Sequence, residues 1–273
     1  SYGAGLIAIG ALDEGRAFLD RVNADEYPEI LLTSSIGFFK EWDYGPSVPL
    51  LKRFIASANI TDYQRLVGQV NLAAAYSALG RYQIAQRMVR RGLRQAKQMN
   101  AKLLLGNLFE ILAQNYFFQG DYERAQKTIE NAQATLQSSN VLSNIFVKKW
   151  KTFLEFERVS GTTEKCGEQC TEKCGAQCNA RKDQRELALV AAAQLRAQAI
   201  ASRHWETVRD LDFHFGIWQK DVNTLEKLYW GTPFLGYRQK IVERAHQDSL
   251  PLSIEKNYFE VGEASNDILD LQS

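Results

Sequence analysis

A repeat with an offset of 40 residues constrains the fold of this chain more than any other feature. The segment NLAAAYSALGRYQIAQRMV at 71–89 aligns with ILAQNYFFQGDYERAQKTI at 111–129. The identical positions, numbered in the first segment, are Leu72, Ala73, Tyr76, Gly80, Tyr82, Ala85 and Gln86. Self-similarity at a fixed period of this length is typical of proteins that stack one small structural unit several times.

The residue types in the repeat predict a helix, a tight turn and a second helix. Leu72, Tyr76 and Leu79 recur at helical spacing and form one apolar stripe. Gly80, like its counterpart Gly120, lies where the first helix must end, because glycine enters the left-handed conformation at little cost. Ala85 is small enough to let two antiparallel helices approach closely. The unit is therefore a pair of packed helices.

This pattern resembles the tetratricopeptide repeat over 66–97 and 106–137. The closing large and small residues of that motif are Val89 and Gly92 in the first copy, and Ile129 and Ala132 in the second. The period exceeds the usual 34 residues, and Lys97 and Gln137 replace the proline that commonly follows the second helix. In these respects the chain resembles the long-period repeats of bacterial regulatory proteins. The resemblance implies an α-solenoid.

The pattern along the whole chain predicts an all-α protein. The expected helices lie near 12–23, 28–41, 46–57, 62–79, 82–98, 102–118, 122–137, 140–159, 184–202 and 205–220. We expect TPR-like helical repeats over 1–160, a Cys-rich inserted loop over 161–183, a further helical repeat over 184–222, and a C-terminal cap or link to a following domain over 223–273. In the last segment, Gly231-Thr232-Pro233 predicts a break before one short helix.

The charge balance and hydropathy do not point to a nucleic-acid or membrane partner. The 33 basic and 32 acidic residues nearly cancel, so net charge favours neither nucleic acid nor membrane as a partner. No apolar run reaches the roughly 20 residues that a membrane helix needs. The sequence begins within a helical pattern, which suggests a fragment of a longer protein, and we expect a cytoplasmic location.

All four cysteines fall in one short segment, EKCGEQCTEKCGAQC at 164–178. Cys166, Cys170, Cys174 and Cys178 are four residues apart, and Gly167 and Gly175 favour a folded loop over a helix. Such a loop could gather four thiolates around zinc, an iron–sulfur cluster or Cu(I). The spacing matches neither the familiar zinc pairs nor the ferredoxin patterns. A tandem duplication in an exposed loop is therefore the competing interpretation.

The resemblance also implies a groove lined by first-helix residues. These positions are Val67, Val70, Ala74, Ser77 and Ala78 in the first copy, and Asn107, Glu110, Gln114, Phe117 and Phe118 in the second. Amide, carboxylate and aromatic groups in the second set suit a peptide, so Asn107, Glu110, Gln114 and Phe117 are the predicted partner-binding residues.

The remaining features favour an interaction module over an enzyme. No nucleophile, phosphate-loop or dinucleotide motif is present. The basic helix at 87–102, with Arg87, Arg91 and Arg94, could hold phosphates or an acidic peptide, or could simply be a solvated face. Without interleaved aromatics, direct nucleic-acid contact is not expected. We expect a protein-, peptide- or effector-binding sensor region of a larger regulatory protein, with self-association left open. The alternative is a metal or redox sensor that uses the cysteines.

Overall fold

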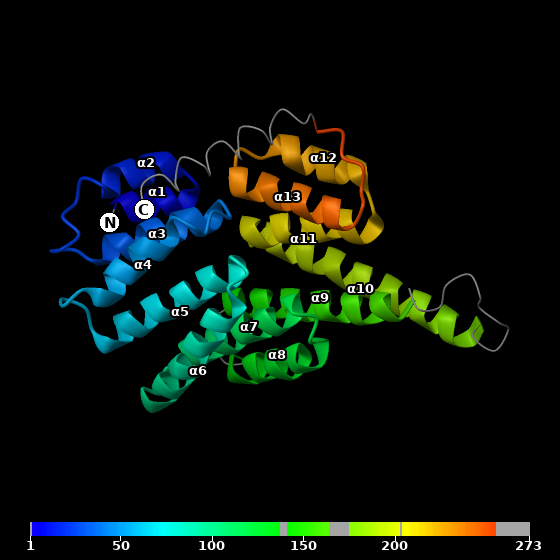
Figure 1. Ribbon diagram of the computed structural model, residues 1–273, viewed down its shortest axis with the longest axis horizontal. Helices are drawn as coiled ribbons and strands as arrows, with labels where there is room; N and C mark the ends of the chain where they lie inside the picture. Colours follow the sequence, from blue (N-terminus) through cyan, green and yellow to red (C-terminus); the bar gives the residue numbers. More distant parts are fainter. Residues whose placement is uncertain (1, 137–140, 164–174, 203, 255–273) are drawn as a thin grey trace. The chain divides into compact units, whose positions relative to one another are not determined.

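The described part of the protein, residues 2–136, 141–163, 175–202 and 204–254 of a computed structural model, is helical and contains no strand (Figure 1). Its helices are α1 (Tyr2–Ile9), α2 (Leu12–Leu19), α3 (Glu29–Lys40), α4 (Ser47–Ala56), α5 (Asp62–Ala78), α6 (Tyr82–Gln98), α7 (Lys102–Phe118), α8 (Tyr122–Leu136), α9 (Val141–Thr163), α10 (Gly175–Ala201), α11 (Trp205–Gln219), α12 (Val222–Gly231) and α13 (Leu235–Gln247). The all-α prediction is confirmed.

The chain divides into two compact units, Ser1–Leu211 and Asp212–Ser273. Within the first unit, helices that follow one another along the chain pack together from α1 to α9, and α9 packs against α10. Helices two apart also touch, since α7 contacts both α5 and α9. We call α5 with α6 copy one, and α7 with α8 copy two.

The turns of the two copies have the same hydrogen bonds. In copy one, Arg81 N–H donates to the carbonyl of Tyr76 at 2.8 Å, and Gly80 N–H donates to Ser77 at 3.0 Å. In copy two, Asp121 and Gly120 repeat these bonds to Tyr116 and Phe117 at 2.9 and 3.0 Å. Both glycines have a positive φ, of 70° and 74°. This is the Schellman end of a helix, where a β-carbon would be strained, so the predicted role of Gly80 and Gly120 is confirmed.

The interfaces inside the two copies use small residues in the same places and exchange one large residue. Ala85 and Ala125 are both fully buried, as their predicted role requires. At another pair of positions, copy one has Leu66 on its first helix and Ala96 on its second, both buried in one core cluster. Copy two reverses the sizes, because Gly106 on the first helix faces buried Leu136 on the second. Each pair thus combines one leucine with one small residue, and the two pairs differ in size by a single methyl group.

The structure corrects the sequence-based boundaries at several places. The N-terminal pattern forms two helices, α1 and α2, joined at Gly10 with φ 93°, and α2 ends at Leu19. Helices α9 and α10 extend into both ends of the range 161–183 that we expected to be a loop, because α9 continues to Thr163 and α10 begins at Gly175. Residues 164–174 lie outside the described part.

The second unit contains the end of α11 followed by α12 and α13, two helices where we expected one. Leu225 of α12 lies against Gly216, a position where a β-carbon would meet the leucine side chain at 2.6 Å. The Asp221 side chain caps α12 by accepting from Thr224 N–H at 3.1 Å. The break at Gly231-Thr232-Pro233 falls between α12 and α13 as predicted. No helix of the described part is long and apolar enough to cross a membrane.

Candidate functional site

The four predicted partner-binding residues lie on α7, and two of them, Glu110 and Phe117, contact α9. Glu110 and Phe117 are buried, whereas Asn107 and Gln114 are half-buried. The Glu110 carboxylate accepts hydrogen bonds from Gln114 Nε2 at 2.9 Å and from the indole Nε1 of Trp150 at 3.1 Å. Trp150 also packs on the Phe117 ring, with centroids 5.5 Å apart. Two of the four side chains are therefore covered by α9, and the partner-binding role of all four stays a prediction.

Trp150 lies one repeat period after Glu110, just as Glu110 lies one period after Val70. Helix α9 thus continues the 40-residue spacing, although its sequence lacks the motif residues that identify the first two copies. The hydrogen bond from Trp150 to Glu110 thus joins two residues that are 40 positions apart in the sequence. The 40-residue period was the one sequence signal that could have indicated a contact between Trp150 and Glu110.

A charged cluster extends this contact through α9 to α11 and α3. It consists of Lys40, Glu110, Lys149, Glu206, Arg209 and Asp210, all within the first unit. At its centre Lys149, a residue that is only 4% exposed, pairs through its ammonium with the Asp210 carboxylate at 2.5 Å. The same ammonium lies 5.1 Å from the ring centroid of Trp150. Sequence reasoning identified Glu110 alone, since the other members are scattered along the chain.

For Glu110 and Lys149, burial and the opposite charges nearby act on the pKa in opposing directions, and the net shift of each pKa is upward. Burial raises the pKa of Glu110 to about 7, against the opposing effects of Lys149 and the two hydrogen bonds. The pKa of Glu206 is raised as well, mainly by burial. Burial lowers the pKa of Lys149, but Asp210, Glu206 and Glu110 outweigh it, and the net shift is upward. At neutral pH Glu110 can therefore exchange a proton while Lys149 keeps its charge.

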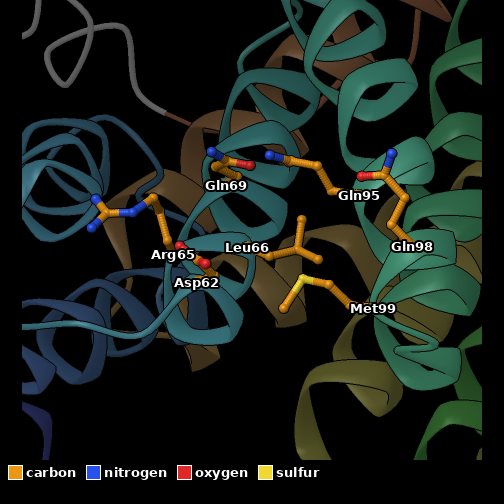
Figure 2. A pocket seen from close by; sticks show the side chains of 7 residues that line it. All are labelled: Asp62, Arg65, Leu66, Gln69, Gln95, Gln98 and Met99. Atoms are coloured by element: carbon orange, nitrogen blue, oxygen red, sulfur yellow. The ribbon is translucent and has the colours of Figure 1, made fainter.

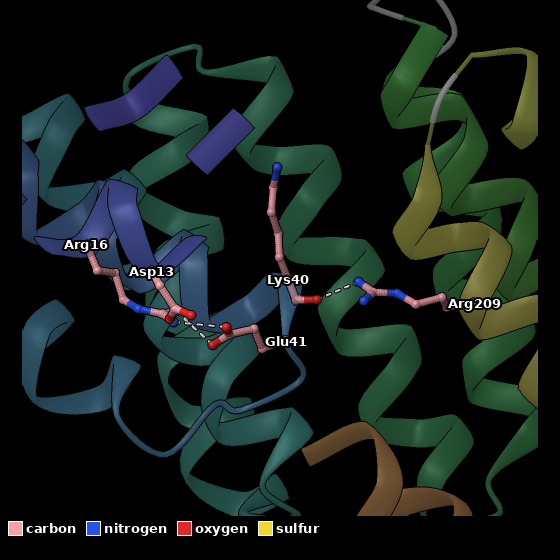
Figure 3. Close-up of polar contacts among 5 residues, drawn as sticks. All are labelled: Asp13, Arg16, Lys40, Glu41 and Arg209. Atoms are coloured by element: carbon pink, nitrogen blue, oxygen red, sulfur yellow. Dashed lines mark hydrogen bonds and ion pairs between the residues drawn. The ribbon is translucent and has the colours of Figure 1, made fainter. Parts of the chain in front are cut away.

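Lys40 and Arg209 connect the cluster to the ends of two N-terminal helices. The guanidinium of Arg209 donates to the carbonyl of Lys40 at 2.5 Å, while the Lys40 side chain extends away from it (Figure 3). The Lys40 ammonium donates to the carbonyls of Ile7 and Ala8, at 2.7 and 3.0 Å. Each cation satisfies carbonyls at a helix C-terminus, where the helix dipole favours positive charge.

A neighbouring ion pair fixes the same helix end. Arg16 of α2 makes a two-point contact with Glu41, at 2.7 and 2.9 Å, and a further contact of 2.6 Å with Asp13 (Figure 3). Its guanidinium also lies 4.8 Å from the Phe38 ring centroid. The two-point geometry orients the end of α3 and thus the backbone that Arg209 contacts.

His204 lies beside the cluster on the segment that leads into α11. Its ring packs edge-on against Phe146, with centroids 4.8 Å apart. Its buried Nδ1 has no hydrogen-bond partner among the described residues. Burial, together with Lys149 and Lys40, lowers the pKa of His204. The imidazole is therefore neutral at physiological pH.

A separate pocket of about 300 Å³ lies between α5 and α6 (Figure 2). Its lining residues are Asp62, Arg65, Leu66, Gln69, Gln95, Gln98 and Met99. Leu66 and Met99 face each other across it, and the Arg65 guanidinium points away. That guanidinium donates instead to the carbonyls of Ile55 and Ser57 at the end of α4. The polar groups left to the pocket are the Asp62 carboxylate and the three glutamine amides.

The predicted metal site falls outside the described residues. Cys166, Cys170 and Cys174 lie outside the described residues, as does the side chain of Cys178, whose backbone belongs to α10. In the part of the chain that the structure describes, no group of three or more His, Cys, Asp or Glu side chains could hold a metal ion. An iron–sulfur cluster, zinc or copper at the cysteines stays a prediction.

No protein-family model, curated protein or solved structure matches this chain. The case for its function therefore rests on its own residues and their geometry.

Proposed function

We propose that the first unit is an α-solenoid of tetratricopeptide-like helix pairs that binds a protein or peptide partner. It would be the interaction or sensor region of a larger bacterial regulatory protein in the cytoplasm. Two copies with the same turn bonds and the same buried alanine support the repeat. The Trp150–Glu110 hydrogen bond supports a third copy in the same spacing.

The charged cluster is the observation that carries the binding proposal. Removing charges such as Lys149 and Glu110 from water costs several kcal/mol per ion, and apolar residues of similar volume would stabilise the fold equally well. Copy one shows that an apolar residue can fill this place, since buried Val70 occupies the position equivalent to Glu110. Strongly perturbed charged groups gather at functional sites more often than elsewhere.

The chemistry next to the cluster suits a peptide backbone. Asn107 and Gln114 are half-buried amides about two helical turns apart along α7, and each can donate and accept. Gln114 is linked through Glu110 to Lys149, so its orientation depends on the cluster. Half-buried amides held in this way can pair with the N–H and C=O groups of an extended segment.

Selection of dodecapeptides displayed on phage against the intact chain tests this proposal. The enriched peptides are synthesised, and their affinity is measured by fluorescence anisotropy. We expect the pair Asn107→Ala and Gln114→Ala to weaken binding about tenfold or more, because each lost hydrogen bond in a binding site contributes roughly 1 kcal/mol.

The matched control pair is Gln83→Ala and Asn131→Ala, which removes the same two amide types from exposed positions on α6 and α8. It should change the affinity less than about twofold. If no peptide is enriched, or if the control pair weakens binding as much as the α7 pair, the proposed role of α7 is wrong.

A further inference from the structure

One face of α6 carries a row of five cations that the charged cluster does not involve. Arg87, Arg90, Arg91, Arg94 and Lys97 are all exposed. They lie opposite the stripe with which α6 packs on its neighbours, which consists of Ala85, Val89, Gly92 and Ala96. At 1.5 Å of rise per residue the row is about 15 Å long.

The row has no counter-charges of its own. Among the described residues, no carboxylate lies within ion-pair distance of any of the five cations. Residues 81–102 contain seven of the 33 basic residues and none of the 32 acidic ones. The other residues therefore hold 26 basic and 32 acidic side chains, a net charge of −6. The net charge of +1 is therefore the sum of a strongly basic segment at 81–102 and an acidic remainder of the chain.

The equivalent helix of copy two shows that the fold does not require this charge. One period later, the positions of Arg87, Arg90, Arg91 and Arg94 hold Lys127, Glu130, Asn131 and Ala134. Arg124 of α8 pairs with Asp121, just before the helix, at 2.9 Å, and Glu130 accepts a hydrogen bond from Gln126 at 2.7 Å. Helix α8 therefore has no comparable row of cations.

The side chains of the row determine which anion fits it. Arginine forks bind phosphate oxygens in pairs. Leu79 and Met99 are exposed just before and just after α6, but no large apolar side chain is exposed within the helix itself. The row therefore offers neither an aromatic platform for single-stranded bases nor an anchor for a membrane or an acidic peptide. A flexible acidic peptide would also lose conformational entropy on binding, whereas a duplex is already rigid.

We propose that the Arg87–Lys97 face of α6 binds the phosphate backbone of a nucleic-acid duplex without reading its sequence. This partner is distinct from the peptide proposed for α7. It replaces the expectation, drawn from the net charge and from the lack of interleaved aromatic residues, that no nucleic acid is bound. With five cations in the row, binding should follow counterion release, with a slope of about −4 in a plot of log K against log salt concentration.

The test titrates the full chain against a fluorescent duplex of about 20 base pairs and arbitrary sequence, between about 50 and 200 mM salt. We expect micromolar affinity at low salt and a loss of about 100-fold or more across that range. Replacing Arg87, Arg90, Arg91 and Arg94 together by Gln should weaken binding at least about 30-fold at the lowest salt and bring the slope close to about −1.

The control variant replaces Arg21, Lys52, Lys127 and Lys227, all exposed, by Gln, so that the net charge changes equally. It should retain the wild-type slope, and circular dichroism should show that both variants are folded. The proposal is overturned if the duplex does not bind at the lowest salt or if the control variant loses as much affinity. A glutamate-rich peptide that binds the row as tightly as the duplex would overturn it too, and would assign the face to an acidic protein instead.

Discussion

Copies one and two share the geometry of their turns and their buried alanines, but differ in the residues on their surfaces. The turns at Gly80 and Gly120 and the buried alanines Ala85 and Ala125 are equivalent in conformation and burial. The residues at the predicted groove are not, because Val70 of copy one is replaced by Glu110 in copy two. The positions that are identical in both copies are those that determine the turn and the close approach of the helices.

The faces that differ are those available for binding. Copy two places a carboxylate against α9 and so extends into the charged cluster, whereas copy one stays apolar there. Copy one instead carries the arginine row on its second helix, where copy two has mixed charge. Each copy therefore combines a common scaffold with a separate specialised surface, and substitutions can test the two parts independently.

The largest effect is expected from removing the central charge beside copy two. Lys149→Met leaves Asp210 and Glu206 without their buried cation, and breaking a buried pair in this way costs about 3–5 kcal/mol. Urea unfolding followed by circular dichroism measures this loss of stability.

Lys148→Met is the matched control, because the neighbouring Lys148 is exposed and only approaches Gln198 Oε1 at 3.5 Å. It should change the free energy of unfolding by less than about 0.5 kcal/mol. Equal effects of the two substitutions would mean that the cluster contributes no more than a surface charge.

The exchange of large and small residues between the copies predicts a rescue. Gly106→Leu should overpack copy two against Leu136, whose Cγ would lie 2.3 Å from a β-carbon at residue 106. Leu136→Ala should leave a cavity. Each change alone should cost about 3 kcal/mol. The double variant reproduces the Leu66 and Ala96 arrangement of copy one, and it should recover at least about 2 kcal/mol of the summed loss.

A double-mutant cycle of unfolding free energies measures this recovery. Strictly additive losses would show that the two interfaces are not interchangeable. The Leu66–Ala96 and Gly106–Leu136 pairs would then pack in different ways, despite their equivalent positions in the sequence.

The features that could be predicted from the sequence are those that depend on local structure or on the repeat, namely the turns and the helix boundaries. Gly80 and Gly120 indicated the turns because only glycine enters the left-handed region cheaply, and most helix boundaries followed from apolar spacing. The cluster was not predictable in this way, since Lys149 and Asp210 come from different helices with no common spacing. The residues 164–174 that contain three of the four cysteines remain beyond any such comparison.

A smaller effect, dependent on pH, should distinguish Glu110 from its apolar counterpart in copy one. The carboxyl has a pKa of about 7 in the fold against 4.5 when unfolded, so the folded state binds the proton more tightly. Stability should therefore fall as pH rises from about 4.5 to about 7, by up to roughly 3 kcal/mol. The groups that face this carboxyl are Lys149, Glu206, Gln114 and Trp150.

Glu110→Gln should flatten this part of the pH profile, as measured by urea unfolding at about pH 5, 6 and 7.5. Exposed Glu123 on α8 provides the control, because Glu123→Gln should leave the slope unchanged. A profile that is equally steep in the Glu110→Gln variant would assign the pH dependence to other groups, with Glu206 the next to test.

The smallest effect concerns Gly92, which copy two replaces by Ala132. An added β-carbon at residue 92 would lie 3.0 and 3.2 Å from the two methyl carbons of Leu108. One period after Leu108 the chain has exposed Lys148, so Ala132 meets no equivalent leucine. Alanine gains about 1 kcal/mol of helix propensity over glycine, and the tight contact offsets this gain.

Gly92→Ala should therefore shift the free energy of unfolding by less than about 0.5 kcal/mol. In a Leu108→Val background, where the contact is relieved, the same substitution should stabilise by up to about 1 kcal/mol. Urea unfolding of the wild type, the two single variants and the double variant measures both values. A loss above about 2 kcal/mol in both backgrounds would show that glycine is needed there for the backbone itself. A gain in both would show that Leu108 yields freely, and the difference between Gly92 and Ala132 would then have no packing cause.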